Sequence, residues 1–308
     1  MKIAVYLAGV PAKTKNEYKR ELLTRFAYGA KLAGDEIYTV DDYTVIDADV
    51  AVLQGWIGMK QAPHLKLRAD VINHQRNTGK HTLVIDSNLF GFLEPNDFNR
   101  YLRYSLDGIF PTTGYYFDNK IDTARWESIK QRYNFTERAW QINGKYVLVC
   151  LQRAGGWSMD GLNVVNWFSK IMPEIQRYSD RPILVRGHPG SMKTLEEIRA
   201  RWPRIEISTL PDIRQDFDRA WATITYNSSP GVASLLWGVS SWITDPNAAR
   251  SQAYQFAETD LSQLENPLRR DRLDLYHKLS QCHFNMAEID SGLAWNFLRQ
   301  RLPNTPRQ

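Results

Sequence analysis

The sequence predicts an α/β protein with two domains, each built on a parallel sheet. Short apolar runs alternate with longer segments of helical spacing, a pattern typical of βαβ units. At 308 residues the chain is long enough for two domains of ordinary size. In the first half we expect strands at 2–7, 36–40, 50–54 and 82–86 and a helix over 16–32. In the second half we expect strands at 146–151, 182–185 and 222–226 and a helix over 160–178.

The expected domain boundaries follow from a change of pattern near the middle of the chain. Between 112 and 144 the sequence is polar, aromatic and only weakly periodic, which is typical of a connection. We therefore expect a first domain over 1–143 and a second over 144–285. The remaining residues, 286–308, are expected to contain a helix over 288–302.

The composition is that of an ordinary globular protein. Hydrophobic residues make up 43% of the chain and charged residues 24%, so neither disorder nor a fibrous structure is expected. No apolar run is long enough for a transmembrane helix, and the start of the chain is too short and strand-like for a signal peptide. We therefore expect a cytoplasmic protein. Its two cysteines, Cys150 and Cys282, predict neither a disulfide framework nor a zinc site.

A first motif, Arg186-Gly187-His188-Pro189, follows the apolar run 182–185. Open α/β sheets bind ligands at the carboxyl ends of their strands. Arg186 offers a planar fork of donors suited to phosphate, and His188, stiffened by Pro189, can donate to a phosphate oxygen or carry a proton. We therefore expect these residues to contact an anion, with His188 as a candidate catalytic residue. The alternative is that Arg186 pairs with a carboxylate and His188 caps a helix.

A second motif begins at Asn227-Ser228-Ser229-Pro230-Gly231, directly after the strand expected at 222–226, and ends at Gly238. Ser229 is a good N-cap because the proline behind it suits the first position of a helix. The amides and the positive dipole end of that helix would favour an anion. A serine before proline would also cap a helix that binds no ligand.

In this order the two motifs resemble the capsule-polysaccharide biosynthesis glycosyltransferases, the group that includes the Kdo transferases. The resemblance continues through 269–281 and 288–295 and covers roughly the second half of the chain. It implies a GT-B architecture, in which two Rossmann-like domains with parallel sheets face each other. It also implies a nucleotide-sugar donor, UDP- or CMP-linked, held mainly by the second domain, no tightly bound cofactor, and a C-terminal helix over 286–308 that packs back toward the first domain.

The sequence departs from this family at one position. Relatives usually carry a glutamate two residues after the motif glycine, where it can bind the ribose hydroxyls of the donor, and this chain has Ala233 there. We expect Ser234 or a residue of another loop to take that role. The departure also keeps open a nucleotide-sugar-binding protein without catalysis, and an epimerase of the same fold remains a further alternative.

The expected donor-binding residues follow the strands of the second domain. Arg153 and Gly155 come after the strand at 146–151 and suit a diphosphate. No group of His, Cys and Glu has the spacing of metal ligands, so we expect arginines to neutralise the phosphate charge without a metal. The expected donor set is Arg153, Gly155, Arg186, His188, Pro189, Asn227, Ser228, Ser229, Gly231 and Ser234.

The first domain is expected to bind the acceptor and to supply a general base. Asp86 and Asp107 are the candidate bases, because both are carboxylates at strand exits of the first domain. A base there could come within hydrogen-bond reach of the acceptor hydroxyl. Asp86 could instead cap the next segment, and Asp107 could simply form a turn with Gly108. The expected acceptor-binding residues lie in loops after strands or carry an aromatic ring for stacking: Gly9, Trp56, Ser87, Asn88, Tyr115 and Trp157.

The acceptor itself is the most open question. The net charge of +5 permits a polyanionic partner. With its basic charge and aromatic loops the chain also resembles the phage-type enzymes that glycosylate hydroxymethylated DNA bases, which share the GT-B fold. We therefore expect a hydroxymethylated base in double-stranded DNA, with a saccharide or lipid-linked capsule precursor as the alternative. No obligate protein partner is expected. The basic residues expected to follow the DNA backbone are Lys13, Lys15, Lys60, Lys66 and Arg68.

Overall fold

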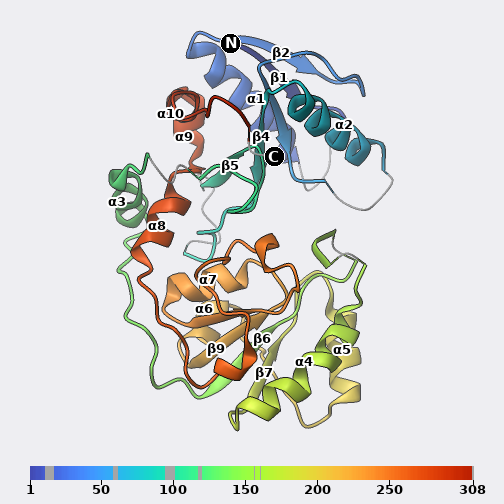
Figure 1. The fold of residues 1–308 in the computed structure, drawn as a ribbon, viewed down its shortest axis with the longest axis vertical. Helices are drawn as coiled ribbons and strands as arrows, with labels where there is room; N and C mark the ends of the chain where they lie inside the picture. The colour runs from blue at the N-terminus through green and yellow to red at the C-terminus, as the bar shows by residue number, and fades with distance from the viewer. Residues whose placement is uncertain are drawn as a thin grey trace. The chain divides into compact units, whose positions relative to one another are not determined.

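The computed structural model describes residues 1–10, 17–57, 62–93, 101–116, 120–155, 157–159 and 161–306. It divides into two compact units, shown in Figure 1. Unit 1 comprises Met1–Ile129 together with His277–Gln308, and unit 2 comprises Lys130–Tyr276. The sequence had suggested boundaries after 143 and 285, whereas the compact units change at 129/130 and 276/277. The chain therefore returns to unit 1 after it has completed unit 2.

Unit 1 contains a six-stranded sheet in the order β11-β5-β4-β3-β1-β2. The strands β1 to β4 are mutually parallel, which confirms the parallel sheet expected from the apolar runs. Strand β5 is antiparallel to β4, and β11 is antiparallel to β5. The strand bounds are β1 Lys2–Tyr6, β2 Glu36–Val40, β3 Val50–Gln54, β4 His81–Asp86, β5 Leu102–Leu106 and β11 His283–Phe284.

Strand β5 was not expected, because its segment carries polar residues and ends in Asp-Gly. The structure shows why it is a strand: its side chains alternate. Leu102, Tyr104 and Leu106 belong to the main apolar core of the unit, while Arg103 and Ser105 point to the other face and are also buried. Its polar positions are buried by tertiary contacts, so the alternation can be recognised only once β5 is seen paired with β4.

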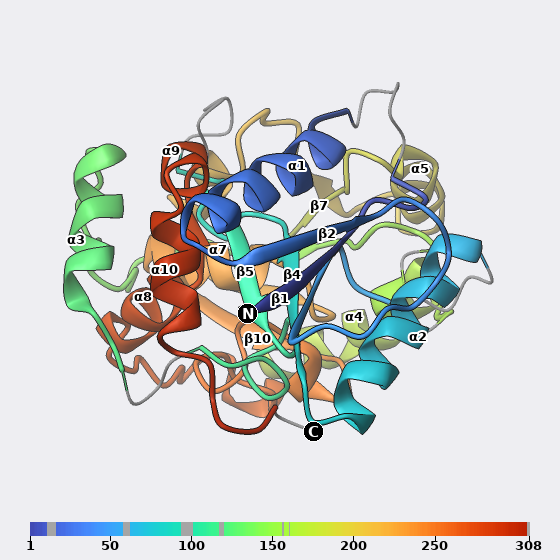
Figure 2. The ribbon, with the colours of Figure 1, turned by 90° about the horizontal axis from the view of Figure 1, so that it is seen from above.

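Helices cover both faces of the unit 1 sheet (Figure 2). Ile3 and Val5 of β1 pack in one core cluster with Phe26 of α1 (Glu17–Leu32), whereas Ala4 and Tyr6 pack in another with residues of α2 (Pro63–Asn77). This alternation is what a strand buried on both faces requires. The remaining helices that begin in this unit or lie wholly within it are α3 Thr123–Arg132, α9 Met286–Asp290 and α10 Leu293–Arg299; α8 Leu273–Ser280 spans the return to it.

The C-terminal residues pack against α1 of unit 1. One helix was expected over 288–302, but two are present, because Gly292 adopts a left-handed conformation (φ +75°) and separates α9 from α10. Asp290 pairs with Arg25 of α1, and the indole of Trp295 donates to Asp35 at 2.5 Å. A Cβ on Gly29 of α1 would lie 1.9 Å from the carbonyl oxygen of Ile289, so only glycine allows this close approach.

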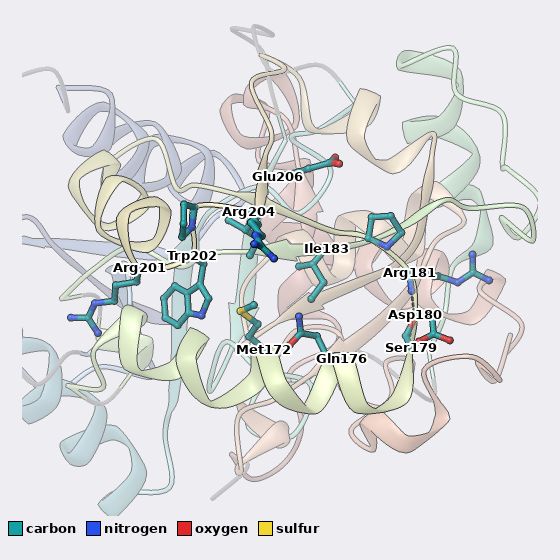
Figure 3. Close-up of a pocket in the computed structure, with 13 residues that line it drawn as sticks. Met172, Gln176, Ser179, Asp180, Arg181, Ile183, Arg201, Trp202, Arg204 and Glu206 are labelled. Atoms are coloured by element: carbon teal, nitrogen blue, oxygen red, sulfur yellow. Dashed lines mark hydrogen bonds between the residues drawn. The ribbon is translucent and has the colours of Figure 1, made fainter.

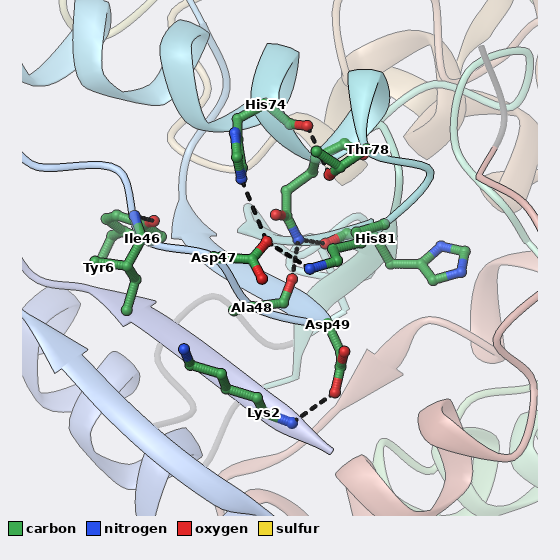
Figure 4. Close-up of polar contacts among 11 residues, drawn as sticks. Lys2, Tyr6, Ile46, Asp47, Ala48, Asp49, His74, Thr78 and His81 are labelled. Atoms are coloured by element: carbon green, nitrogen blue, oxygen red, sulfur yellow. Dashed lines mark hydrogen bonds and ion pairs between the residues drawn. The ribbon is translucent and has the colours of Figure 1, made fainter.

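Polar contacts tie the elements of unit 1 together at the edge where β3 and β4 begin (Figure 4). The side-chain amide of Gln75 in α2 donates to the carbonyls of Ala48 and His81, at 3.1 and 2.7 Å. The backbone N–H of Lys2 donates to Asp49 at 2.7 Å. Because buried backbone carbonyls need partners, Gln75 explains why this end of α2 stays on the sheet.

Unit 2 contains a five-stranded parallel sheet in the order β10-β9-β6-β7-β8. The expected strands and the helix between the first two are confirmed, with Asn163 as the N-cap of α4. The strand bounds are β6 Tyr146–Cys150, β7 Ile183–Arg186, β8 Glu206–Ile207, β9 Ala220–Thr225 and β10 Ser240–Ile243. The helices are α4 Val164–Tyr178, α5 Met192–Arg201, α6 Ile213–Phe217 and α7 Pro230–Trp237, with short 3-10 turns η1 Trp157–Met159, η2 Ala248–Arg250 and η3 Leu261–Gln263. Among the described residues, no helix is long and apolar enough to cross a membrane.

Candidate functional site

The strand order of unit 2 places a topological switch point between β6 and β9. From β6 the chain moves outward through β7 to β8, then crosses back to β9 and moves outward on the other side to β10. Parallel α/β sheets bind ligands in the crevice at the carboxyl ends of the two strands that flank such a point. Gln152 and Asn227 lie two residues beyond the ends of β6 and β9 at this point.

Gln152 and Asn227 form a buried hydrogen-bond network at this point. The Gln152 amide donates to the side chain of Asn227 at 2.7 Å and to the Ser158 hydroxyl at 2.6 Å. The Asn227 amide in turn donates to the Ser158 carbonyl at 2.9 Å and to Asp245, which follows β10, at 2.6 Å. Asn227 was expected to bind the donor, but its amide is committed to protein partners, so it positions the strand exits. Gln152 and Asp245 were not expected; their only sequence signal is that each follows a strand.

Arg153 and His188 lie next to each other beside this network. A Cβ on Gly190 would lie 3.3 Å from Nδ1 of His188 and 3.8 Å from Nε of Arg153. The hydroxyl of Ser191 accepts from the N–H of Ala154 at 3.0 Å, which ties the loop after β6 to the loop after β7. Arg153 is exposed and forms no ion pair with any described residue. Its charge is therefore available to a ligand.

The hydrogen bonds of His188 define its tautomer. Nδ1 accepts from the backbone N–H of Gly190 at 3.0 Å, so this nitrogen carries no proton. Burial lowers the pKa of His188, and the neighbouring charge of Arg153 lowers it further. The ring is consequently neutral near pH 7 and carries its proton on Nε2, where it can donate to an anionic oxygen. Pro189 follows in the turn, and Gly155 is in a left-handed conformation (φ +66°) with open space around it.

Arg186 has partners different from the anion that its motif predicted. Its Nη1 lies 2.5 Å from Asp216, which is fully buried, and also donates to the carbonyl of Leu210 at 2.9 Å. Its Nη2 donates to the carbonyl of Pro211 at 3.2 Å. Arg186 therefore holds the segment before α6 against β7. This is the carboxylate-paired alternative, so two nitrogens of the guanidinium expected to contact a phosphate are engaged within the protein.

Helix α7 begins at Pro230, as the second motif predicted, but its residues are placed differently from the expectation. Ser229 occupies the N-cap position, yet its side chain makes no capping hydrogen bond. Ser234 is fully buried and donates to the carbonyl of Gly231 at 2.9 Å, so it cannot replace the missing glutamate as a ribose ligand. Gly231 is buried as well. A Cβ at this position would lie only 3.2 Å from the Ser241 hydroxyl. Its role is close packing of α7 on the sheet.

Ser228 is the residue of this motif that remains suited to a ligand. Its hydroxyl is shielded from solvent and has no hydrogen-bond partner among the described residues. A buried hydroxyl without a partner costs free energy, about 1–3 kcal/mol. A bound phosphate or sugar oxygen would satisfy it.

The carboxyl edge of the unit 1 sheet carries Asp86 at the end of β4. One carboxylate oxygen lies 2.9 Å from Nη2 of Arg103, and the other accepts from the N–H of Ser87 at 2.7 Å. Asn88 follows and accepts from the N–H of Phe90 at 2.8 Å, forming a tight turn. The Asp86 side chain keeps 24% of its surface exposed, so an acceptor hydroxyl can still reach it.

Asp107, the second candidate base, lies at the opposite edge of the same sheet. Strand β5 runs antiparallel to β4, so Arg103 at its start is paired with Asp86 while Asp107 at its end bonds to Thr82 at the start of β4. Its carboxylate lies 3.0 Å from Nδ1 of His81 and is almost fully buried. Asp107 is therefore a structural residue, and its expected role as a base is corrected by the direction of β5.

Tyr115 lies at the same edge of the sheet as Asp107. Its backbone pairs with Leu106 at that same edge, and its ring packs against the main core of the unit. It therefore does not lie beside Asp86 as an acceptor-binding residue would. The other expected acceptor residues of unit 1, Gly9 and Trp56, follow β1 and β3 at the same edge as Asp86. Trp56 is half-buried against a core cluster.

The His81–Asp107 pair predicts that stability depends on pH. Burial lowers the pKa of His81, but the hydrogen bond and charge of Asp107 outweigh it, so the net pKa is raised. A raised histidine pKa adds stability that is fully present below about pH 6.5 and is lost as the pH rises through the folded pKa. We expect the stability advantage of the native chain over His81→Gln to shrink between about pH 6 and about pH 9 in urea unfolding. An advantage of equal size at both ends would contradict this.

Several expected residues lie outside the part of the chain that the structure describes. These are Lys13, Lys15 and Lys60 of the expected DNA-binding set, together with the side chain of Trp157. Of the described members of the basic set, Lys66 is exposed on α2, and Arg68 is half-buried beside the loop after β3.

Two pairs of aspartates have the Asp-x-Asp spacing that metal-dependent sugar transferases use, Asp47 with Asp49 and Asp216 with Asp218. In the structure Asp216 pairs with Arg186, and Asp47 pairs with Lys80 at 2.5 Å. Asp218 pairs with Arg138, and Asp49 accepts from the backbone N–H of Lys2 at 2.7 Å.

Of the cavities of unit 2, two that lie at opposite edges of its sheet are relevant to a ligand site. The larger, about 650 Å³, is lined by the ends of α4 and α5 and the starts of β7 and β8, with Met172, Trp202 and Glu206 among its residues (Figure 3). It lies at the amino edge, away from the switch point, and so is not the expected ligand site. The smaller, about 490 Å³, is lined by Asp245 and the residues that follow it after β10. It adjoins the buried network and has the size of a small-ligand pocket.

Comparisons with known proteins give a fold relationship. No family model matches the chain, and no curated protein matches it. Among solved structures, the chain is similar to the β-Kdo 2,4-transferase of KpsC from Thermosulfurimonas dismutans, with a TM-score of 0.55, 12% identity and coverage of 96% of this chain and 98% of that one. It is also similar to the β-Kdo 2,7-transferase of the same KpsC, with a TM-score of 0.51, 11% identity and coverage of 96% and 100%. At such identities the likeness concerns the fold: this chain has an α/β fold of the GT-B type, built from two Rossmann-like units.

Proposed function

We propose that the chain is a glycosyltransferase that moves a sugar from a nucleotide-sugar donor to a hydroxyl group of an acceptor. The observation that carries the proposal is the pair Arg153 and His188 at the carboxyl edge of the unit 2 sheet, beside the switch point. Among the described residues, one offers a guanidinium with no carboxylate partner and the other a neutral imidazole with a free N–H. Together with the unsatisfied hydroxyl of Ser228, they supply three donors for the phosphates of a nucleotide.

The chemistry needs these donors when the sugar leaves. The acceptor oxygen forms a bond to the anomeric carbon, and the bond from that carbon to the phosphate oxygen breaks with its electron pair going to the nucleotide. Negative charge therefore grows on the phosphate in the transition state. Donors that are already in place stabilise such charge without reorganisation. In this proposal Arg153 and His188 take that role, which the motif alone would have given to Arg186.

The proton of the acceptor hydroxyl goes to Asp86 in this proposal. Each carboxylate oxygen has two lone pairs, so Asp86 retains acceptor capacity beside its bonds to Arg103 and Ser87. Arg103 is 2% exposed and fixes the orientation of the carboxylate. Arg103 is thus a positioning residue, and Asp86 is the base.

Replacing Arg153 by alanine should weaken donor binding about 10- to 100-fold, because hydrogen bonds to charged groups contribute about 1.5–3 kcal/mol. The stability of the fold should not change, since the side chain is exposed and forms no ion pair with the part of the chain that the structure describes. Isothermal titration with UDP, CMP and their sugars measures the affinity. Arg199→Ala is the matched control, because Arg199 is exposed in the last turn of α5, far along the helix from the site. Equal affinity in Arg153→Ala would overturn the donor-site assignment.

The acceptor is identified by mass. The protein is incubated with UDP- and CMP-sugars and with either duplex DNA containing hydroxymethylated bases or a panel of saccharides. A product heavier by one sugar establishes transfer and names donor and acceptor together. A donor that changes its sugar without an acceptor would indicate an epimerase, and tight donor binding without turnover would indicate a binding protein. We keep the hydroxymethylated DNA base as the first acceptor to test, because the chain carries a net charge of +5.

A further inference from the structure

Three basic side chains at the carboxyl edge of the unit 1 sheet, near Asp86, are close enough to interact through their charges. Lys19 comes from the first turn of α1, and His64 and Arg68 come from the first half of α2. Two glycines in the left-handed conformation bring the strand exits up to them. A Cβ on Gly9, after β1, would lie 2.3 Å from Cβ of His64, and a Cβ on Gly55, after β3, would lie 3.3 Å from Nη1 of Arg68.

The charge of this basic cluster, which comprises Lys19, His64 and Arg68, is not compensated within the described residues. Arg68 makes one hydrogen bond, to the carbonyl of Trp56 at 3.3 Å, and the other two make none. Asp86 is close enough to act on Lys19 and Arg68 through its charge, but its hydrogen bonds go to Arg103 and Ser87. The cluster is thus a concentration of positive charge with no bonded carboxylate.

Three other arginines of unit 1, unlike Arg68, form ion pairs with carboxylates. Arg20 pairs with Asp41, Arg25 with Asp290, and Arg125 with Glu288. Each of these pairs joins two elements of the unit, so the arginine has a structural reason to be there. Arg68 is half-buried and has no such partner in the described ranges, although burying an unpaired charge costs free energy.

Burial without a bonded carboxylate lowers the pKa of all three side chains of the cluster. Burial lowers the pKa of Lys19, and the charge of Arg68 lowers it further. Burial and Arg68 lower the pKa of His64 in the same way, and burial lowers the pKa of Arg68. An anion bound among the three side chains would reverse these effects.

We propose that Lys19, His64 and Arg68 form a subsite for an oxyanion carried by the acceptor, a carboxylate or a phosphate group. The proposal rests on the glycosyltransferase function above, in which the phosphates of the donor are bound by Arg153 and His188 of unit 2. A second anion site in unit 1 then belongs to the acceptor. Its position beside Asp86 means that an acceptor hydroxyl at the base would carry its anionic group a short distance away, so the subsite would select acidic acceptors and orient them.

The direct test follows the imidazole of His64 by NMR, assigned by its loss in His64→Gln. UDP is added first at saturation to occupy unit 2, and inorganic phosphate, glucuronate or glucose is then titrated. Phosphate or glucuronate should shift the His64 signals and raise its pKa, and neutral glucose should not. Glucuronate acting alone would identify a carboxylate site, and phosphate acting alone a phosphate site. A His64 that ignores both anions would overturn the proposal.

Matched variants assign the effect to the subsite. Arg68→Gln should weaken the anion response at least tenfold, whereas Arg68→Lys should retain part of it and guards against a loss caused by misfolding. Arg76→Gln removes a positive charge from the exposed last turn of the same helix and should leave the response unchanged. An equal loss in Arg76→Gln would mean that only overall charge attracts the anion, which contradicts a built subsite.

The same experiment separates this proposal from the one it rests on. If UDP and CMP fail to bind, the donor assignment in unit 2 is wrong, whatever His64 does. If they bind and His64 ignores both anions, the donor assignment stands and the acceptor subsite is wrong. Once an acceptor is known, Arg68→Gln should raise its KM at least tenfold and leave the KM of the donor unchanged.

Discussion

Replacing Arg186 by alanine should lower the free energy of unfolding of unit 2 by about 3–5 kcal/mol, because it leaves a buried carboxylate without its partner. Asp216 is fully buried, and Arg186 is the cation beside it, at 2.5 Å. The variant also removes the donors of the Leu210 and Pro211 carbonyls. Loss of activity in this variant would therefore report loss of structure.

Hydrogen exchange measured by mass spectrometry localises the effect. In Arg186→Ala, exchange should rise in β6, β7 and α6 of unit 2, while the strands of unit 1 should keep their protection. Arg153→Ala provides the contrast, because it removes an exposed arginine from the neighbouring loop and should change stability by less than about 0.5 kcal/mol. If Arg186→Ala folded normally and only lost donor binding, the assignment of Arg186 as a structural residue would fail.

Replacing Trp295 by alanine should lower the stability of unit 1 by about 3–5 kcal/mol, the usual range for removing a buried tryptophan. The indole is 1% exposed and belongs to the main core, where it packs edge-on against Phe26 at a centroid distance of 5.7 Å. Its N–H also donates to Asp35. The variant therefore combines a large cavity with a lost hydrogen bond.

The control for this prediction lies on the same helix. Leu293 of α10 is 62% exposed, so Leu293→Ala should change stability by less than about 0.5 kcal/mol. Exchange should rise in β1, β3 and α1 of Trp295→Ala, and unit 2 should be unaffected. Equal protection of unit 1 in both variants would mean that the C-terminal helices contribute little to the core.

The parallel strands could be predicted from the sequence because each is a short apolar run bounded by turn residues. In β1 and β3 both faces are buried, so hydrophobic patterning alone identifies them. Strand β5 could not be predicted in this way, because Arg103 and Ser105 interrupt its apolar positions and are buried by tertiary contacts. The antiparallel direction of β5 places Asp107 at the edge of the sheet opposite Asp86. No local sequence pattern reveals the direction of this strand.

The candidate donor site was predicted in part. The strand exits that hold Arg153 and His188 were expected, because polar and glycine residues follow apolar runs there. The partner of Arg186 was not, since Asp216 is thirty residues further along the chain and nothing in its own neighbourhood marks it as buried. A sequence motif indicates which side chains lie near the end of a strand. Whether such a side chain is free to bind a ligand depends on its partners elsewhere in the fold.

The return of the chain to unit 1 has a consequence for its synthesis. Residues 1–129 leave the ribosome before unit 2, but their core still lacks Phe284, Ile289 and Trp295, which are made after it. Unit 2, over 130–276, is continuous and can complete its core as soon as it emerges. Domains usually fold in the order in which they are made. Here the unit that starts first is completed only after unit 2, so the part of its core that Phe284, Ile289 and Trp295 cover stays exposed while unit 2 is made.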